Sequence, residues 1–321
     1  MKLVVITGCL GFIGSHVTRS CLEKGWQVYG VDKCTYAANL ELLEEFGENT
    51  NFFFVEKDIK ELDYLPDCDY IINLAAETHV GNSIIESKEF VETNVLGVKN
   101  LLDLIRNKPN NVCQRPILFH ISTDEVYGDI IGDNHNENSI LNPSNPYSAS
   151  KASSDMMIQA WSRTYGLDYI ILRPTNNYGV GQYPEKLIPL ATKLLMRGKK
   201  IRLHDEGLPV RNWLHAKDTS SAILKIIEKG KINEVYNVAG GFEQKNIDTV
   251  RKIINSYYNN NAFEDYDNWK ECLDLNHKRP GQDVRYALDD NKLRELGWKP
   301  EYSFDEEINK IVQFYKNNFK W

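Results

Sequence analysis

The sequence lacks the features that mark membrane proteins, nucleic-acid-binding proteins and metalloproteins. No apolar run approaches the ~20 residues of a membrane span. Acidic side chains outnumber basic ones by 45 to 38, and no basic block occurs. We therefore expect neither a membrane nor a nucleic-acid partner. No group of His, Cys, Asp and Glu has metal-ligand spacing, so we also expect no metal.

Paired cysteines are missing as well. The six cysteines are scattered along 321 residues and form no CxxC pair. In a chain long enough for a large core, this usage predicts free thiols in a reducing compartment. The opening segment MKLVVITG is too short for a secretory signal and runs directly into a glycine motif. We therefore expect a cytoplasmic protein.

Short apolar segments alternate with helical patterns in the first half of the chain. The segments that read as buried strands are LVVIT, QVYGVD, FFFVEKD, YIINLAA, ILFHIS and YIILRP. Strands that alternate with helices indicate βαβ units. We therefore predict an α/β fold, a Rossmann doubly wound parallel sheet with a smaller α/β C-terminal substrate domain. We place the Rossmann domain at residues 1–175, with a later contribution from about 208–238, and the second domain mainly at 176–321.

A glycine motif follows the first predicted strand. In TGCLGFIG, Gly8, Gly11 and Gly14 are spaced GxxGxxG between a strand and a helix. Such glycines let the backbone approach a pyrophosphate, and the helix N-terminus attracts the anion. Asp32 ends the second strand, where a carboxylate holds the ribose hydroxyls of NAD and repels the 2′-phosphate of NADP. We therefore predict NAD as the cofactor, although Lys33 weakens the preference over NADP.

Further candidates for NAD binding lie beyond the carboxyl ends of the strands, where doubly wound sheets bind ligands. Asp58 and Ile59 end the third strand and are expected near the adenine. Ala75 and Ala76 end the fourth strand and leave space for the cofactor. The candidate cofactor-binding residues are Gly8, Gly11, Phe12, Ile13, Gly14, Asp32, Lys33, Thr35, Asp58, Ile59, Leu74, Ala75, Ala76, Thr78, Asn94, Tyr147 and Lys151.

Residues 147–151 read YSASK, so Tyr147 and Lys151 share one face of a helix. A lysine ammonium near a phenol favours the phenolate and lowers the pKa of the tyrosine. A tyrosine tuned in this way accepts the proton during oxidation of an alcohol. An ordinary surface pair is the alternative, because YxxxK is common by chance. The dinucleotide motif upstream favours the catalytic interpretation.

Two carboxylates directly follow a buried strand in STDEVYG at residues 122–128. Burying charge is costly, so Asp124 and Glu125 need a reason to be there. One interpretation is a strand-end cap whose charges are solvated. The other is a pair of carboxyl groups that take part in catalysis.

The combination of GxxGxxG and YxxxK resembles the extended short-chain dehydrogenase/reductases. The segments HISTDEVYG and NNYGVGQYPEKLIPL further resemble the nucleoside-diphosphate-sugar 4,6-dehydratases, most of all those that act on dTDP-glucose. The resemblance implies NAD-dependent dehydration of dTDP-glucose to dTDP-4-dehydro-6-deoxy-glucose. The expected steps are oxidation at carbon 4, elimination of water across carbons 5 and 6, and hydride return to carbon 6. It also implies a homodimer that pairs helices at 86–107 and 147–165.

The same resemblance assigns roles. It makes Glu125 the base at carbon 5 and Asp124 the acid at carbon 6, two tasks that need opposite protonation states. The implied catalytic residues are Thr123, Asp124, Glu125, Tyr147 and Lys151. The implied substrate contacts are His79, Thr123, Asn176, Asn177, Glu185, Lys186, Leu187, Arg211, Asn246, Arg279 and Tyr286. The arginines suit a nucleotide sugar because a guanidinium pairs with phosphate oxygens.

Departures from the family pattern leave the substrate open. Gly81 and Asn82 replace the usual Asp-Arg or Asp-Asn, HDEG at 204–207 replaces a pattern near the nucleobase, and Gln282 replaces a histidine. UDP-glucose or another nucleotide hexose is therefore an alternative substrate. An epimerase would leave Asp124 and Glu125 unexplained. A non-catalytic NAD or nucleotide-sugar sensor predicts loss of a catalytic group, and none is missing.

Overall fold

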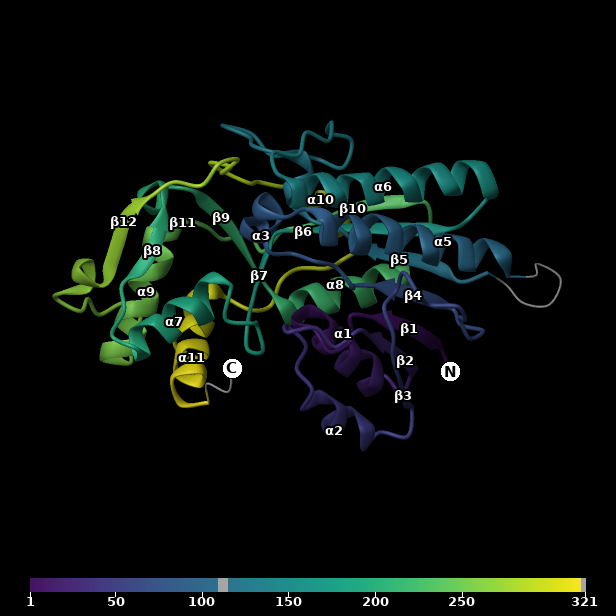
Figure 1. The fold of residues 1–321 in the computed structure, drawn as a ribbon, viewed down its shortest axis with the longest axis horizontal. Helices are drawn as coiled ribbons and strands as arrows, with labels where there is room; N and C mark the ends of the chain where they lie inside the picture. The colour runs from purple at the N-terminus through teal and green to yellow at the C-terminus, as the bar shows by residue number, and fades with distance from the viewer. Residues whose placement is uncertain (109–114, 319–321) are drawn as a thin grey trace.

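The computed structural model describes residues 1–108 and 115–318 (Figure 1). Its larger lobe contains a seven-stranded sheet of order β10-β6-β5-β4-β1-β2-β3, in which every neighbouring pair is parallel. The strands are β1 (Leu3–Thr7), β2 (Gln27–Asp32), β3 (Phe52–Glu56), β4 (Tyr70–Asn73), β5 (Ile117–Ile121), β6 (Tyr169–Pro174) and β10 (Glu234–Val238). The predicted doubly wound parallel sheet is confirmed. The division of the chain into two domains stays a prediction.

Helices cover both faces of this sheet (Figure 1). On one face lie α1 (Phe12–Glu23), α2 (Leu42–Gly47) and α8 (Ala216–Lys229), and on the other lie α5 (Val98–Asn107) and α6 (Pro146–Tyr165). Val4 and Ile6 of β1 point into the core under α1 and α8, whereas Val5 points into the core under α5 and α6. Because successive side chains of a strand face opposite ways, a strand covered on both faces is apolar throughout.

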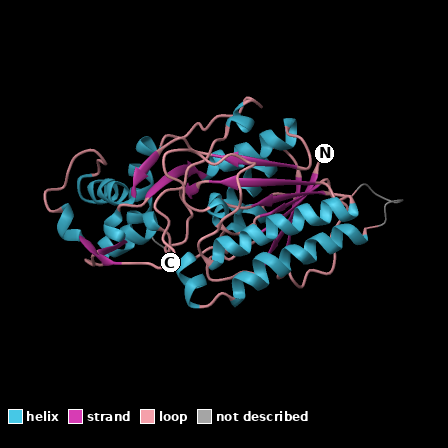
Figure 2. Cartoon of the chain, turned by 90° about the horizontal axis from the view of Figure 1, so that it is seen from above, coloured by secondary structure: helices cyan, strands magenta, loops and turns pink. Residues whose placement is uncertain are grey.

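The smaller lobe is assembled from short elements of the second half of the chain. One sheet joins β7 (Asn176–Tyr178), β9 (Val210–His215) and β11 (Glu243–Lys245), and a second joins β8 (Ile201–His204) to β12 (Leu273–His277). The helices α7 (Leu187–Met196), α9 (Asn246–Asn259) and α11 (Phe304–Asn317) pack against them around a separate apolar core. Figure 2 shows this lobe at the opposite end of the molecule from the N-terminus.

The predicted helix at 86–107 differs from the observed one. It begins with α4 (Lys88–Phe90), continues as the π-helical stretch η1 (Val91–Gly97) and ends as α5. Within η1 the Asn94 amide donates to the carbonyl of Glu77 and to the Ser150 hydroxyl. π-helical turns occur most often at functional sites, and this one places Asn94 between the loop after β4 and helix α6.

Membrane spans, cysteines and metal-binding groups were sought in the described residues. No helix in these ranges is long and apolar enough to cross a membrane. Their five cysteines are free thiols, and Cys113 lies outside them. Nor do the described ranges hold a group of three or more His, Cys, Asp and Glu side chains able to bind a metal.

Candidate active site

The strand order of the larger sheet reverses between β1 and β4, which opens a crevice beyond the carboxyl ends of these strands. The glycine loop forms one wall of this crevice, and its backbone packs tightly against neighbouring backbone. A Cβ on Gly8 would lie 2.8 Å from the backbone nitrogen of Ala75, and one on Gly14 would lie 1.9 Å from the carbonyl oxygen of Gly8. Within the described residues, no side chain caps the N-terminus of α1. The first N–H groups of this helix therefore remain available to an anion.

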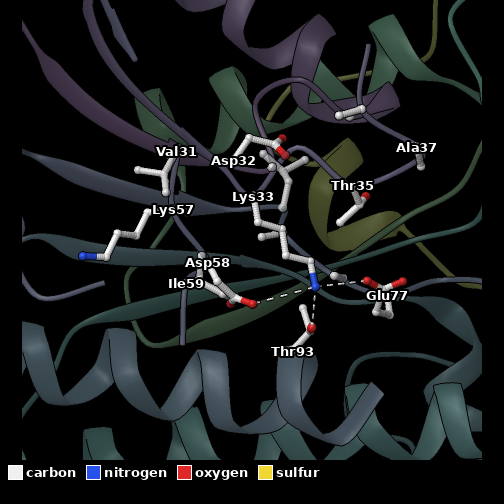
Figure 3. A pocket seen from close by; sticks show the side chains of 16 residues that line it. Val31, Asp32, Lys33, Thr35, Ala37, Lys57, Asp58, Ile59, Glu77 and Thr93 are labelled. Atoms are coloured by element: carbon white, nitrogen blue, oxygen red, sulfur yellow. Dashed lines mark hydrogen bonds and ion pairs between the residues drawn. The ribbon is translucent and has the colours of Figure 1, made fainter. Parts of the chain in front are cut away.

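Asp32 lies at the end of β2 and lines the crevice (Figure 3). Its carboxylate accepts the N–H groups of Leu10 at 3.0 Å and Cys34 at 2.9 Å. Burial raises the pKa of this carboxyl, and the two backbone hydrogen bonds oppose that shift. Each oxygen keeps further acceptor capacity, so the fixed carboxylate fits the hydroxyls of a ribose.

Lys33 points away from Asp32, as Figure 3 shows. Its ammonium lies 3.2 Å from Glu77 and 3.9 Å from Asp58, and it donates to the hydroxyl of Thr93 at 3.2 Å. Two carboxylates therefore neutralise this lysine, which is not left free to attract the 2′-phosphate of NADP. Lys33 is therefore no reason to doubt the preference for NAD over NADP.

The cofactor candidates mostly meet in this crevice. Those that line it at the Asp32 end are Gly8, Gly11, Asp32, Lys33, Thr35, Asp58, Ile59, Leu74, Ala75 and Ala76. The crevice continues into a larger cavity lined by Phe12, Ile13, Gly14, Thr78, Tyr147 and Lys151. Asn94 lines neither part, because its side chain is buried behind the loop after β4.

The larger cavity also contains the two carboxyl groups of STDEVYG. Thr123 ends the loop after β5 and caps the 3-10 turn η2 (Asp124–Tyr127), accepting the Glu125 N–H at 3.3 Å. Its hydroxyl donates to one oxygen of Asp124 at 3.1 Å, whereas the other oxygen is buried and has no partner among the described residues. Asp124 is only 3% exposed, so a solvated strand-end cap does not explain it.

The two carboxyl groups have different surroundings. Burial, with the charge of Glu125 as the next cause, raises the pKa of Asp124 to about 7. Glu125 is less buried, and one of its oxygens lies within hydrogen-bond reach of Asn145 and Tyr286. A carboxyl group that is protonated near neutral pH is suited to donate a proton, and an adjacent, better solvated one is suited to accept a proton.

Helix α6 holds Tyr147 and Lys151. Asn145 caps the helix through a reciprocal hydrogen-bond pair with Ser148, and Pro146 occupies its first turn. Both features define a helix start. The first turn is therefore fixed, and Tyr147 faces the cavity beside Thr123.

One expectation about this pair is wrong. Lys151 donates to the carbonyl of Ile121 at 2.7 Å and lies 3.3 Å from His120, and within the described residues its ammonium makes no hydrogen bond to the phenol. The pKa of Tyr147 is raised rather than lowered, first by burial and then by the charge of Glu125. Burial lowers the pKa of Lys151 to about 8. The ammonium turns to a backbone carbonyl, and so it does not act on the phenol directly in this arrangement.

The candidate substrate residues divide into two sets. Asn176, Asn177, Glu185 and Lys186 line the same cavity as the carboxyl groups. The ammonium of Lys186 donates to the carbonyl and hydroxyl of Thr78 at 2.9 and 3.1 Å, which connects the two lobes across the cavity.

The remaining candidates lie outside that lining. His79 caps α3 (Val80–Ile85), Leu187 packs against the core of the smaller lobe, and Asn246 begins α9. Arg211, Arg279 and Tyr286 lie near Glu125. Tyr286 contacts it, and Arg211 stacks on the ring of Tyr286. Burial lowers the pKa of Arg279, and the charge of Glu125 opposes this shift.

The structure also reveals site residues that the sequence analysis missed. His120 and Asp155 lie beside Lys151 in the protein interior, and Arg173 pairs with Asp155 at 2.9 Å. Gln182 and Tyr183 join the cavity lining. Two signals were present: a histidine inside the apolar run ILFHI, and an aspartate that continues the four-residue spacing of Tyr147 and Lys151.

Comparison with known proteins gives a consistent result. The family described as GDP-mannose 4,6 dehydratase matches residues 5–311. A dTDP-glucose 4,6-dehydratase of Neisseria meningitidis serogroup B is 40% identical over 340 residues, covering 100% of this chain and 95% of the relative.

Solved structures agree with the sequence relatives. A dTDP-glucose 4,6-dehydratase from Streptomyces venezuelae with NAD and the nucleotide TYD bound has a TM-score of 0.90 and 36% identity, covering 98% of this chain and 97% of that one. The corresponding structure from Bacillus anthracis in complex with NAD has a TM-score of 0.86 and 35% identity, covering 99% and 97%.

Proposed function

We infer that this chain, which belongs to the GDP-mannose 4,6 dehydratase family, catalyses the NAD-dependent dehydration of dTDP-glucose to dTDP-4-dehydro-6-deoxy-glucose. The observation that carries the inference is the pair Asp124 and Glu125, which lie beside Tyr147 in the cavity that continues the dinucleotide crevice. An epimerase has no use for an additional acid and base. A non-catalytic sensor would not need Asp124 to be held in a proton-donating state.

The residues of the crevice fit NAD. We propose that the glycine loop and the N-terminus of α1 hold its pyrophosphate, that Asp32 holds the adenosine ribose, and that Asp58 and Ile59 border the adenine. We propose that Lys151, which lines the same cavity, holds the nicotinamide ribose. The bound cofactor supplies hydride chemistry, uptake of hydride from carbon 4 and its return to carbon 6.

Each proton transfer then has a residue in the cavity. Tyr147, assisted by Thr123, takes the hydroxyl proton at carbon 4. The resulting ketone acidifies the proton at carbon 5, which Glu125 removes, and the electron pair of the broken C–H bond forms a carbon–carbon double bond. Asp124 protonates the hydroxyl leaving carbon 6, so that water departs. When hydride returns to carbon 6, Glu125 gives the proton it holds back to carbon 5. A pKa of about 7 keeps much of Asp124 protonated at neutral pH.

The nucleotide part of the substrate extends towards the smaller lobe. Arg211 and Arg279 are proposed to meet the phosphates, since both lie on the Glu125 side of the cavity and guanidinium groups pair with phosphate oxygens. Asn176, Asn177, Glu185, Lys186 and His79 are proposed to contact the sugar and diphosphate, and Leu187 and Asn246 are proposed to border the nucleotide.

We also propose a homodimer formed through the helical stretch 86–107, which contains α4, η1 and α5, and through α6. Helices α5 and α6 lie side by side along one face of the larger lobe (Figure 2). Apolar side chains on this surface are exposed, including Leu96 and Met156 at 50% and 63%. Pairing with the same face of a second copy would cover them. Light scattering of the purified protein measures this directly, and a monomeric mass would contradict it.

The test of the function uses two substrates side by side. Purified protein with added NAD is incubated with dTDP-glucose and with UDP-glucose, and the products are weighed by mass spectrometry. We expect loss of one water from dTDP-glucose with no net consumption of NAD. Loss of water from UDP-glucose alone would overturn the nucleotide assignment. Inversion at carbon 4 without loss of mass would replace the dehydratase with an epimerase.

A further inference from the structure

The base Glu125 is contacted by a segment that lies 161 residues away in the sequence. The hydroxyl oxygen of Tyr286 lies 3.3 Å from Oε2 of Glu125. On its other side the same hydroxyl contacts Oδ2 of Asp283, and this contact is the shorter of the two. Tyr286 and Asp283 are 2% and 3% exposed, so water does not compete for these groups.

A phenol has one hydrogen and two carboxylates reach it, so only one of them can receive the hydrogen bond. Asp283 is the better placed acceptor, since its contact with the phenol is the shorter of the two, and a hydrogen bond from the hydroxyl of Ser144 fixes the same carboxylate oxygen. Glu125 instead faces the lone pairs of the phenol. Its Oε2 is approached by the amide of Asn145 at 3.4 Å.

The segment that carries Asp283 and Tyr286 is held in place independently of Glu125. The carboxylate of Asp129 accepts the N–H groups of Val284 and Arg285 at 2.6 and 3.0 Å. Arg211 donates to the carbonyl of Asp283 at 3.1 Å, and its guanidinium lies 4.4 Å from the centre of the Tyr286 ring. The phenol is therefore fixed on both sides, and its position does not depend on the state of the base.

We propose that Asp283 and Tyr286 are positioning residues for Glu125: Asp283 takes the single phenolic hydrogen, so that the phenol oxygen faces Oε2 of Glu125 without donating to it. The assignment rests on the proposed role of Glu125 at carbon 5. In that step the carbon 5–hydrogen bond breaks, an O–H bond forms on Glu125, and the electron pair moves between carbons 5 and 6 as water leaves with the proton of Asp124. A hydrogen bond from Tyr286 would stabilise ionised Glu125 and weaken the base.

The experiment separates the steps in Asp283→Asn, Tyr286→Phe and the double variant. Rapid mixing with dTDP-glucose follows formation of reduced cofactor, which reports oxidation at carbon 4. Exchange of the carbon 5 hydrogen in deuterated water reports the action of the base. The Glu125→Gln variant gives the exchange rate that remains without this base. Tyr236→Phe is the matched control, because the hydroxyl of this buried tyrosine accepts the N–H of Lys231 far from the cavity.

We expect Asp283→Asn to slow carbon 5 exchange by about ten- to one-hundred-fold, the range for a changed hydrogen bond to a charged group. Tyr286→Phe removes the oxygen against which Oε2 of Glu125 lies and frees the carboxylate to turn, so it should also slow exchange. Formation of reduced cofactor should keep its rate in Asp283→Asn, because oxidation at carbon 4 precedes the step that uses Glu125. In the Tyr286→Phe background, Asp283→Asn should add little, since Asp283 acts through the phenol.

The contrary results are distinct. A raised KM with unchanged carbon 5 exchange would make Tyr286 and Asp283 substrate contacts and overturn the assignment. Additive effects in the double variant would overturn the route through the phenol. If the unaltered protein eliminates no water from dTDP-glucose, the proposed function itself fails, and the variants are then not at issue.

Discussion

The ammonium of Lys151 lies 3.3 Å from Nε2 of His120, and both side chains are buried. The other ring nitrogen of His120 lies 2.9 Å from the amide of Asn73, whose oxygen accepts the hydroxyl of Thr7 at 2.6 Å. A line of buried polar groups therefore runs from the end of β1, beneath the glycine loop, to the catalytic helix. These contacts fix the position of the Lys151 ammonium. They also place its charge in the protein interior, which destabilises the fold.

Replacing Lys151 with methionine should raise stability while removing activity. Burial lowers the lysine pKa to about 8 from 10.5, so the folded state binds this proton less tightly than the unfolded state. The destabilisation is complete below pH 8 and disappears as the pH rises to 10.5. At pH 7 we expect a gain on the order of 1–3 kcal/mol in the free energy of unfolding.

Denaturant unfolding at pH 7 and at pH 10 measures this effect. The gain should shrink at the higher pH. The control is Lys199→Met at an exposed position, which should change stability little at either pH. A Lys151→Met protein that is less stable than the unaltered one at pH 7 would show that the ammonium stabilises the fold.

Asp124→Asn should block elimination after oxidation. The amide keeps an acceptor for the Thr123 hydroxyl but has no acidic proton to give. We expect elimination to slow by ~10²–10⁴, the usual contribution of a general acid. Reduced cofactor should accumulate, which absorbance records. Unchanged turnover would remove Asp124 from the role of acid.

The same residue predicts a pH dependence. Asp124 acts as an acid only when protonated, so elimination by the unaltered protein should decline as the pH rises through about 7. The folded-state pKa lies above the ordinary 3.8, so the cost of the buried charge is absent below pH 3.8 and complete above pH 7. Asp124→Asn should therefore unfold at higher denaturant concentration than the unaltered protein at pH 8. A rate that is constant from pH 6 to 9 would contradict the assignment.

Tyr147→Phe should stop the reaction before any cofactor is reduced. The phenol is the group placed to take the carbon 4 proton, and its loss should slow hydride transfer by ~10²–10⁴. Rapid-mixing absorbance with dTDP-glucose measures the step, and calorimetric titration with NAD checks that the crevice is intact. Fast formation of reduced cofactor in this variant would assign the proton transfer to another residue.

Asp32→Asn should weaken NAD binding and reduce the preference over NADP. The variant can still accept the N–H of Leu10, but it loses the charge that strengthens bonds to ribose hydroxyls and repels a 2′-phosphate. We expect about ten-fold weaker binding of NAD. Lys33→Met is the control, and it should leave the preference unchanged because Glu77 and Asp58 already neutralise this ammonium. A shifted preference in Lys33→Met would show that the lysine reaches the cofactor.

Local patterns in the sequence predicted the parallel sheet and three parts of the site: the glycine motif, Asp32 and the YSASK segment. Three features can each be recognised within a short stretch of sequence: the glycine spacing in TGCLGFIG, the acid Asp32 at a strand end and the four-residue interval in YSASK. The structure brings them together along the crevice and the larger cavity that continues it. The direction of the Lys151 side chain on α6 could not be predicted in this way, because it depends on His120 and Ile121 of strand β5. Asp283 likewise meets Ser144 only through the tertiary fold. Strands of three residues, such as β7 and β11, are too short to show a period.

The edge strand β10 has a consequence for the order in which the chain folds. It pairs with β6, yet residues 175–233 lie between them, and most of the first smaller-lobe elements belong to that interval. During synthesis the first six strands of the large sheet emerge early, while the outer edge of β6 stays unpaired until residues 234–238 leave the ribosome. Completion of the large sheet must then wait for part of the small lobe. An arrested nascent chain ending before β10 would therefore present an open edge to chaperones or to another copy.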